Sequence, residues 1–242
     1  MDNIHFRNSP LVEVSFYAEC VPSVLLDDEK AKFAQKKLLS GYQSDVFPES
    51  RVRRVVLDDP QERERWVIVA ENKGERVVII FKSNLFSYTY KGVYDSWENY
   101  IERAKVSFHD YLAFLKPLKV NRLGVRNINE ICNLPFSSHP TAILVDLPHP
   151  RDGLKTVPVE YMVRDRQYYP DYDLFSTVLQ TERLSKDEKD VHWRATVDID
   201  VFAMNKEGLD LSEIDVWLER MRTLKNAVFV RAFHKEILEL FK

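Results

Sequence analysis

Two amphipathic segments, each opened by the pattern Asp-x-x-Glu, constrain the fold of this chain most. Asp95-Ser-Trp-Glu98 precedes apolar residues that recur every three or four positions as far as Leu115, and Asp210-Leu-Ser-Glu213 precedes a similar segment over 212–241. In a capping box the first side chain accepts a hydrogen bond from the helix's third N–H, and the glutamate returns one. An apolar stripe at that spacing is typical of a helix with one buried face. The sequence therefore predicts two long helices.

The segments between these helices alternate between apolar and polar residues, which is typical of strands with one buried face. A shorter helix of about three turns is predicted to begin at Asp27-Asp28, where carboxylates stabilise the positive helix end. The predicted strands cover 12–20, 52–57, 65–71, 76–90 with a break near 82–84, 120–131, 156–164, 176–183 and 192–202, and a proline-rich arm covers 132–153.

This order of elements predicts an α+β fold of two similar β-α-β-β-β-α halves. The halves cover 1–117 and 118–242, and each ends in one of the long helices. Antiparallel sheets would pack against the two helices, either as two domains or as one fused domain with a shared sheet. We interpret the similarity as a structural duplication, although few orders of elements exist and two α+β halves can look alike without one.

The composition excludes several classes of function. The formal net charge is −3, which lacks the basic balance of a general nucleic-acid binder, although a local basic face stays open. With six glycines and no Gly-x-Ser-x-Gly or P-loop pattern, a glycine-rich phosphate loop is not expected. The two cysteines, Cys20 and Cys132, are far apart, and no apolar run approaches the roughly 18 residues of a membrane helix. We expect a cytoplasmic protein that does not bind a membrane.

Candidate binding residues lie on the predicted strand 120–131. Arg122 and Arg126 share one face, and Asn129 lies on the other. A guanidinium group binds carboxylates and phosphates through two parallel hydrogen bonds, so the two arginines could form an anion site. The alternative is an internal network in which they pair with aspartates of a neighbouring strand.

A second set of candidates is the arginine- and tyrosine-rich segment 163–172, with Arg164, Arg166, Tyr168 and Tyr169. Arginine and tyrosine are enriched in binding hot spots, and both also stack on nucleic-acid bases. The alternative is an exposed hairpin that only connects two strands.

Asp198 and Asp200 are the candidate metal ligands, because the alternation of 192–202 places both carboxylates on one strand face. Carboxylates at that spacing could hold Mg²⁺ or Mn²⁺. Two ligands are too few, so a further acidic residue or histidine must converge. The alternative is that the carboxylates pair with arginines, in which case we expect no cofactor.

Four segments together resemble an uncharacterised, sporadically distributed prokaryotic protein family of about this length. The shared positions are Pro10, Leu11 and Glu13, then Arg122, Gly124, Arg126, Ile128 and Asn129, then the strand Asp198–Phe202, and finally Lys225 and Asn226. The resemblance implies no reaction, and the family's patchy distribution suggests accessory loci such as defence or toxin–antitoxin systems. The element order also resembles the TATA-binding and helix-grip families in topology alone.

We therefore expect a non-enzymatic binding protein that recognises another protein or associates with itself as a homodimer. The first alternative is a phosphoesterase-like enzyme that uses a divalent metal at Asp198 and Asp200. The second is a nucleic-acid binder on a saddle-like sheet, which requires a basic and aromatic sheet face.

Overall fold

The computed structural model confirms an α+β fold in which sheet predominates. It describes residues 9–39, 42–48, 66–72, 74, 76–92, 96–135, 160–186 and 191–241. The strands are hydrogen-bonded in the order β2-β3-β4-β5-β1-β6-β9-β8-β7. Their bounds are β1 Leu11–Val21, β2 Gln43–Pro48, β3 Trp66–Asn72, β4 Val77–Lys82, β5 Leu85–Lys91, β6 Lys119–Pro135, β7 Glu160–Tyr169, β8 Leu174–Lys186 and β9 Val191–Met204. The helices are α1 Asp28–Lys37, α2 Trp97–Leu115, the 3₁₀ turn η3 Leu211–Glu213, α3 Ile214–Ala232 and α4 Lys235–Glu239.

The chain forms two compact units. Unit 1 comprises Met1–Glu13, Arg126–Phe202 and Ile214–Lys242, and unit 2 comprises Val14–Val125 and Ala203–Glu213. The long strands β1, β6 and β9 contribute residues to both units.

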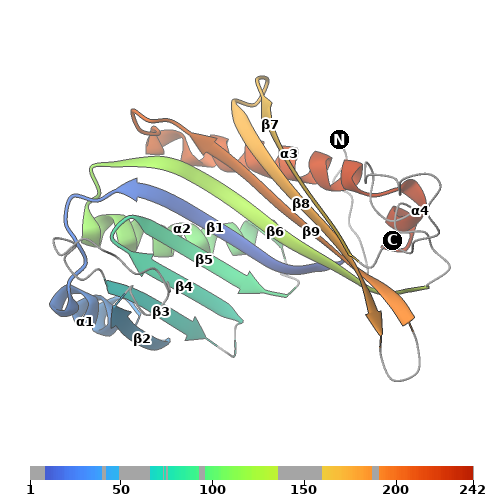
Figure 1. Ribbon diagram of the computed structural model, residues 1–242. Coiled ribbons are helices and arrows are strands. Elements are labelled where there is room, and N and C mark those ends of the chain that lie inside the picture. The colour runs from blue at the N-terminus through green and yellow to red at the C-terminus, as the bar shows by residue number, and fades with distance from the viewer. Residues whose placement is uncertain are drawn as a thin grey trace, which may run out of the picture. The chain divides into compact units, whose positions relative to one another are not determined.

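Unit 2 contains α1, α2 and the strands from β2 to β5. The pairs β2–β3, β3–β4 and β4–β5 are antiparallel, and Figure 1 shows α2 crossing one face of this sheet. The alternation of β1 buries Val14, Phe16 and Ala18 completely. Aromatic side chains fill the space beneath α2, with the ring centroids of Phe16 and Phe108 5.4 Å apart. The predicted alternation of 12–20 and the break near 82–84, between β4 and β5, are both confirmed.

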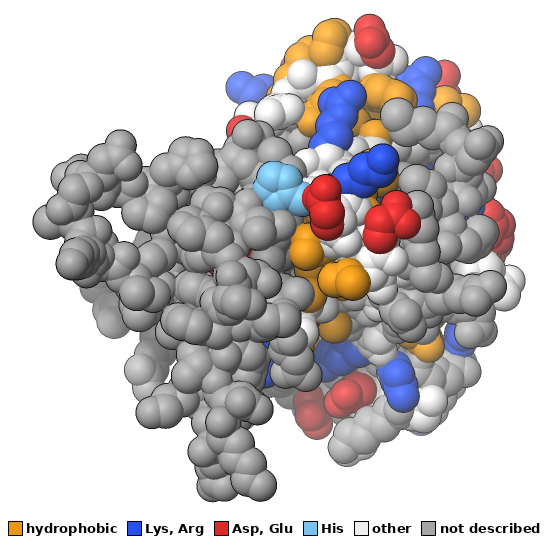
Figure 2. Space-filling view, turned by 90° about the vertical axis from the view of Figure 1, so that its right-hand side faces the viewer, with side chains coloured by type: hydrophobic (Ala, Val, Ile, Leu, Met, Phe, Trp, Pro, Cys, Tyr) orange, Lys and Arg blue, Asp and Glu red, His pale blue; other side chains and the backbone are white. Residues whose placement is uncertain are grey.

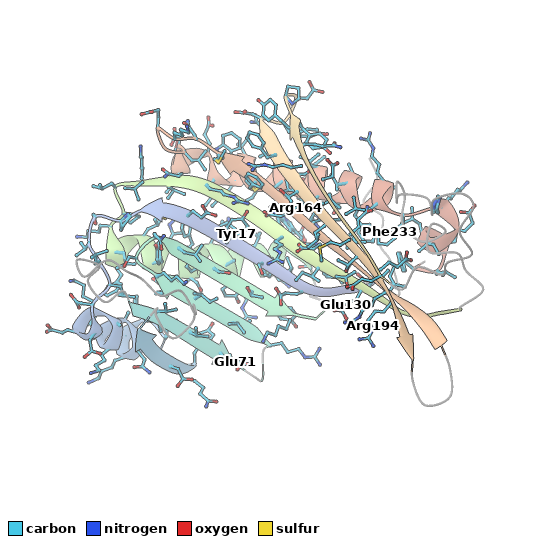
Figure 3. The ribbon with its side chains drawn as sticks, in the orientation of Figure 1. Tyr17, Glu71, Glu130, Arg164, Arg194 and Phe233 are labelled. Carbon is cyan, nitrogen blue, oxygen red and sulfur yellow. The ribbon has the colours of Figure 1, made fainter. Side chains whose placement is uncertain are left out.

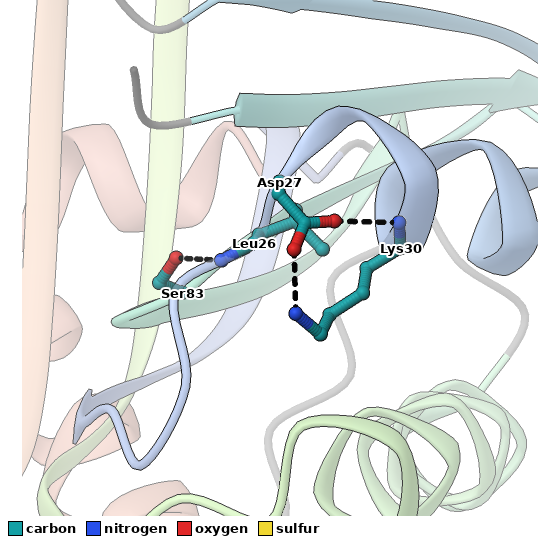
Figure 4. A network of polar contacts seen from close by, with 4 residues as sticks. All are labelled: Leu26, Asp27, Lys30 and Ser83. Carbon is teal, nitrogen blue, oxygen red and sulfur yellow. Dashed lines mark hydrogen bonds and ion pairs between the residues drawn. The ribbon is translucent and has the colours of Figure 1, made fainter. Parts of the chain in front are cut away.

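The start of α1 shows why a helix begins at the predicted aspartates. Asp27 is the N-cap, and its Oδ1 accepts a hydrogen bond from the backbone N–H of Lys30 at 2.8 Å. The preceding N–H of Leu26 donates to Ser83 Oγ at 2.7 Å, which ties the helix to the β4–β5 turn (Figure 4). Asp28 and Glu29 then place negative charge in the first turn, where the helix dipole favours it.

The N-cap of α2 differs from the prediction by one residue. Ser96 caps the helix, and its hydroxyl accepts from the N–H of Asn99 at 3.1 Å. The predicted cap, Asp95, lies outside the described residues. Serine and aspartate are similarly favourable caps, so the pattern located the helix but not its first residue. At the other end, Lys116 adopts a left-handed conformation with φ 45°, immediately before Pro117.

Unit 1 contains β7, β8, most of β9, and α3 with α4. The pairs β7–β8 and β8–β9 are antiparallel, and Figure 1 shows α3 running alongside β9. The odd-numbered residues of β9 from Ala195 to Val201 are buried, as are Leu218, Met221 and Leu224 of α3. These apolar surfaces form the core of unit 1.

Two predicted elements need correction, and one strand was missed. The single helix predicted over 212–241 is η3, α3 and α4, with the chain leaving the helix between Ala232 and Lys235. The start of the predicted arm, 132–135, continues strand β6, and β2 was not predicted at all. The predicted strand 52–57 and the arm from 136 onward lie outside the described residues.

Candidate binding surface

Register across three strands brings most of the predicted site residues onto one face of unit 1. Residues directly opposite each other in an antiparallel pair point to the same side of the sheet. We call this side the polar face of unit 1. It carries three cross-strand rows: Arg164, Leu179 and Asp198; Arg166, Thr177 and Asp200; and Tyr168, Phe175 and Phe202.

Arg126 of β6 joins this face through an ion pair with Asp198. Its Nε donates to Asp198 Oδ1 at 2.8 Å, and its Nη2 donates to Oδ2 at 2.5 Å. The hydrogen bonds with Asp198 raise the pKa of Arg126 above its usual value, and the charges of Asp200 and Glu13 act in the same direction. This geometry is the internal arginine–aspartate network that we gave as the alternative to an anion site.

The pair with Arg126 also bears on the predicted metal ligands. A cation at Asp198 would have to displace both hydrogen bonds from the guanidinium group. Within the described ranges, no group of three or more histidine, cysteine, aspartate or glutamate side chains is placed to hold a metal ion. The Mg²⁺ or Mn²⁺ site at Asp198 and Asp200 stays a prediction.

Arg166 lies over two aromatic rings of the same face. Its guanidinium carbon is 5.5 Å from the ring centre of Phe175 and 5.2 Å from that of Phe202. The two phenylalanine rings are stacked, with centroids 5.5 Å apart. Tyr168 extends the group, because its ring centroid lies 4.9 Å from that of Phe175. The aromatic rings hold the arginine side chain in place without neutralising its charge.

Strand β7 is the exposed part of this face. It ends the order of the described strands, and Met162 and Tyr168 are 68% and 51% exposed. Arg164 and Arg166 are exposed as well, and neither forms an ion pair with any described residue. Figure 3 shows Arg164 on the β7–β8 hairpin.

The hydrogen bonds of the β7–β8 hairpin are local. Tyr168 donates its hydroxyl proton to Asp173 Oδ1 at 2.9 Å, and this bond raises the pKa of the tyrosine. Tyr169, on the opposite side of β7, donates to Gln167 Oε1 at 2.9 Å. Asp173 itself adopts a left-handed conformation with φ 54° at the end of the turn. These contacts shape the hairpin and leave the two arginines of β7 available to a partner.

Arg122 lies in unit 2 and has a different role from Arg126. Its Nη1 donates to Glu19 Oε1 at 3.1 Å, and its guanidinium carbon lies 5.1 Å above the ring of Tyr17. That ring covers Gly124, where an added Cβ would lie 2.5 Å from the tyrosine. Tyr17, labelled in Figure 3, belongs to β1. The arginine and glycine of this strand therefore build a packed cluster with β1.

Asn129 is buried on the other side of β6 from Arg126. It is 3% exposed, and its Nδ2 donates to the carbonyl oxygen of Val197 at 3.1 Å. The structure thus brings Arg126, Arg164, Arg166, Tyr168, Asp198 and Asp200 onto one face. It does not bring Arg122, Asn129 or Tyr169 there.

Two buried ionisable residues of unit 1 were not found from the sequence. Glu182 is completely buried, no described residue gives its carboxylate a hydrogen bond, and burial raises its pKa to about 8. Lys225 of α3 is 6% exposed, and burial together with the charge of Arg222 lowers its pKa to about 8. The alternation of β8 could have identified Glu182, because Leu174, Ser176 and Glu182 share its buried side.

The charged side chains that Figure 2 colours are of both signs. On the face that it presents, acidic and basic side chains of the described residues lie beside one another. Among the helices of the described part, none is long and apolar enough to cross a membrane. No family model matches the chain, and no curated protein matches it.

Proposed function

We propose that this chain is a cytoplasmic, non-enzymatic binding protein that recognises another polypeptide by strand addition at β7. The observation that carries the proposal is the exposure of β7 as the last strand in the order, with Met162 68% and Tyr168 51% exposed. An edge strand presents a row of N–H and C=O groups that can pair with an incoming strand. In such complexes main-chain hydrogen bonds give affinity, and alternate side chains give specificity.

The side chains of β7 have the chemistry of a binding hot spot. Such spots are enriched in tyrosine and arginine, which combine large contact area with hydrogen bonding. Arg164 and Arg166 project on the same side as Tyr168, so an incoming strand would meet two cations and one aromatic ring. This favours a partner strand with acidic residues at alternate positions.

The other terminal strand of the order, β2, is a weaker candidate. Helix α1 packs against β2 and β3 in unit 2. A helix beside an edge restricts the approach of another strand. We therefore assign the binding edge to β7.

The test is selection of displayed extended peptides with the purified full-length chain, followed by titration of the selected peptides. Met162→Lys should weaken binding at least about 30-fold, because it places a charge where an apolar anchor is buried on binding. The control is Val106→Lys on α2, since Val106 is similarly exposed at 62%. Equal affinity for the two variants, or a selection that yields no specific peptide, would contradict recognition of a foreign strand at β7.

A second candidate function is single-stranded nucleic-acid binding on the polar face of unit 1. The position of Arg166 over Phe175 and Phe202 favours it, because bases stack on aromatic rings and on guanidinium planes. The aspartates of the same face oppose it. Titration with a single-stranded oligonucleotide at two salt concentrations tests this candidate, because phosphate contacts make the affinity fall steeply as the salt concentration rises. Binding that is absent, or insensitive to salt, would exclude this candidate.

We also propose the duplication of the halves 1–117 and 118–242. Its support is that each half contains a 19-residue helix, α2 or α3, that follows antiparallel strands. Separate expression of the two halves tests it, because duplicated domains should each fold alone. Two unfolded fragments would favour the single fused domain.

A further inference from the structure

Two copies of β7 could pair with each other through their exposed edges if their side chains are complementary. When a strand pairs antiparallel with its own copy about a two-fold axis, the residue on the axis lies opposite its own copy. Residues at equal distances on either side of it then lie opposite each other, and opposite residues share a face. Each choice of central residue therefore fixes every cross-strand pair.

Three central residues produce repulsion. An axis at Arg164 places that arginine opposite its copy, and an axis at Arg166 does the same for Arg166. An axis at Asp165 places the two aspartates opposite each other and also places Arg164 opposite Arg166. Like charges in directly opposite positions destabilise a strand pair.

An axis at Met162 would place Glu160 opposite Arg164, but it pairs only the five residues 160–164 of the described strand. An axis at Val163 also produces attraction, and it pairs a longer part of β7. Glu160 of each copy then lies opposite Arg166 of the other, and Met162 lies opposite Arg164. The overlap is the seven residues 160–166, it contains no like-charge pair, and the two-fold axis gives the glutamate–arginine pair twice. The exposed Met162 would pack against the aliphatic part of the arginine side chain, which commonly covers apolar surface.

We infer that β7 pairs antiparallel with β7 of a second copy of this chain, centred on Val163. This inference rests on the proposed function of β7 as a binding edge and names the partner strand. Because the two-fold axis is perpendicular to the sheet, the polar faces of the two copies lie on the same side. The dimer would thus present Arg164 and Tyr168 of both copies to one side, and the edge of each β7 would be closed over its first seven residues.

The test is a charge exchange on the full-length chain, with the dimer dissociation constant measured by sedimentation equilibrium. Glu160→Arg alone would place arginine opposite Arg166, and Arg166→Glu alone would place glutamate opposite Glu160. Each should weaken the dimer about tenfold or more, since two attractive pairs become two repulsive pairs. The double variant Glu160→Arg/Arg166→Glu exchanges the charges and should return the constant to within about threefold of the original.

A second measurement does not depend on charge. In a Cys132→Ser background, Val163→Cys should be joined to its own copy by a short bis-maleimide linker, because cross-strand Cβ atoms lie about 5 Å apart. The control is Val216→Cys on α3, where Val216 is 48% exposed; that cysteine should remain uncoupled. Far-UV circular dichroism confirms that each variant is folded.

Two results would overturn the inference: a wild-type chain that stays monomeric at the highest concentration reached, or folded single variants that dimerise as tightly as the wild type. Equal linking of the Val163→Cys and Val216→Cys variants would also overturn it. The chain could instead stay monomeric while Met162→Lys still weakens the binding of the selected peptides. That result would support the proposed function and exclude only the pairing with a second copy. A dimer that obeys the charge exchange but selects no foreign peptide supports the inference and limits β7 to self-association.

Discussion

The sheets of the two units each carry a polar face, and the two faces differ in where their side chains find partners. In unit 2, Arg122 pairs with Glu19 and lies over Tyr17, while Ser15 and Thr89 share a hydrogen bond of 2.9 Å. In unit 1, Arg126 pairs with Asp198, and the arginines of β7 are exposed.

This difference suggests two roles for polar residues: those of unit 2 stabilise the fold, and the exposed ones of unit 1 bind a partner. Paired polar groups on a sheet fix its register and packing, and their loss is measured as lost stability. Exposed cations that form no ion pair contribute little to stability, and their charge can contribute to binding. The four predictions below test this separation, beginning with the largest effect.

Glu182 should make the stability of the protein depend strongly on pH. Burial raises the pKa of its carboxyl group from the ordinary 4.5 to about 8 in the folded protein. Between these pH values the unfolded chain releases a proton that the folded chain keeps, so the free energy of unfolding falls as pH rises, by about 1.4 kcal/mol per pH unit. Glu182→Gln should remove this fall and be more stable than the wild type at pH 8.

Urea unfolding at pH 5, 6.5 and 8 measures the effect of Glu182. The matched control is Glu160→Gln, because Glu160 is an exposed carboxylate of the neighbouring strand. If the free energy of unfolding changed equally with pH in the wild type and in Glu182→Gln, the buried carboxylate would have to be solvated or paired. Unit 1 would then pair its polar groups as unit 2 does.

Gly124→Ala should destabilise the packed cluster of unit 2. The added Cβ would lie 2.5 Å from Tyr17, closer than packed atoms can approach, so the tyrosine ring must move off Arg122. Overpacking of this kind costs about 1–3 kcal/mol. Thermal or urea unfolding measures it, with Gly74→Ala as the control, because the nearest atom there lies at 3.5 Å. An unchanged stability would show that the cluster does not hold the sheet.

Arg126→Ala should cost less, about 1–2 kcal/mol. The change removes two charge-assisted hydrogen bonds and leaves the Asp198 side chain, only 13% exposed, without its partner. Arg126 is itself 44% exposed, so solvent reduces the loss. A double-mutant cycle with Asp198→Ala measures the coupling between the two side chains. A coupling energy near zero would mean that Arg126 and Asp198 contribute as little to stability as the exposed arginines of β7.

Arg164→Ala should change the free energy of unfolding by no more than about 0.5 kcal/mol, as is usual for exposed positions that form no ion pair with a described residue. The same variant should weaken the binding of an acidic peptide selected on β7. Unfolding and peptide titration on the same preparation compare the two effects. A stability loss as large as that of Arg126→Ala would show that Arg164 has a structural partner, and the distinction between the two units would fail.

Periodicity predicted the faces of the strands correctly and the contacts between strands poorly. The alternation of β9 placed Asp198 and Asp200 on one face, and the register confirms this. Pairing of Asp198 with an arginine was one of two alternatives, and the sequence could not decide between it and a metal site, because the outcome depends on the strand order and on how the strands align. Phe175 and Phe202 likewise meet Arg166 only through the alignment that the turn after Tyr169 sets.

The errors in the predicted elements have physical causes. Strand β2, with the sequence Gln-Ser-Asp-Val-Phe-Pro, has little alternation of its own and forms by pairing with β3. The break between α3 and α4 has no glycine or proline to mark it, and it coincides with the ring contacts among Phe229, Phe233 and Phe241. In both places tertiary packing decides the local structure, and a single sequence does not show it.

Strand β6 has a further consequence for how this chain can change in evolution. Its 17 residues pass from unit 2 to unit 1 between Gly124 and Arg126. One residue inserted there would reverse the two sides of the strand in one unit only, turning the amides of Asn127 and Asn129 outward and a guanidinium group into the core. Two inserted residues would restore the alternation. We therefore expect insertions and deletions within this strand to be tolerated only when they add or remove an even number of residues.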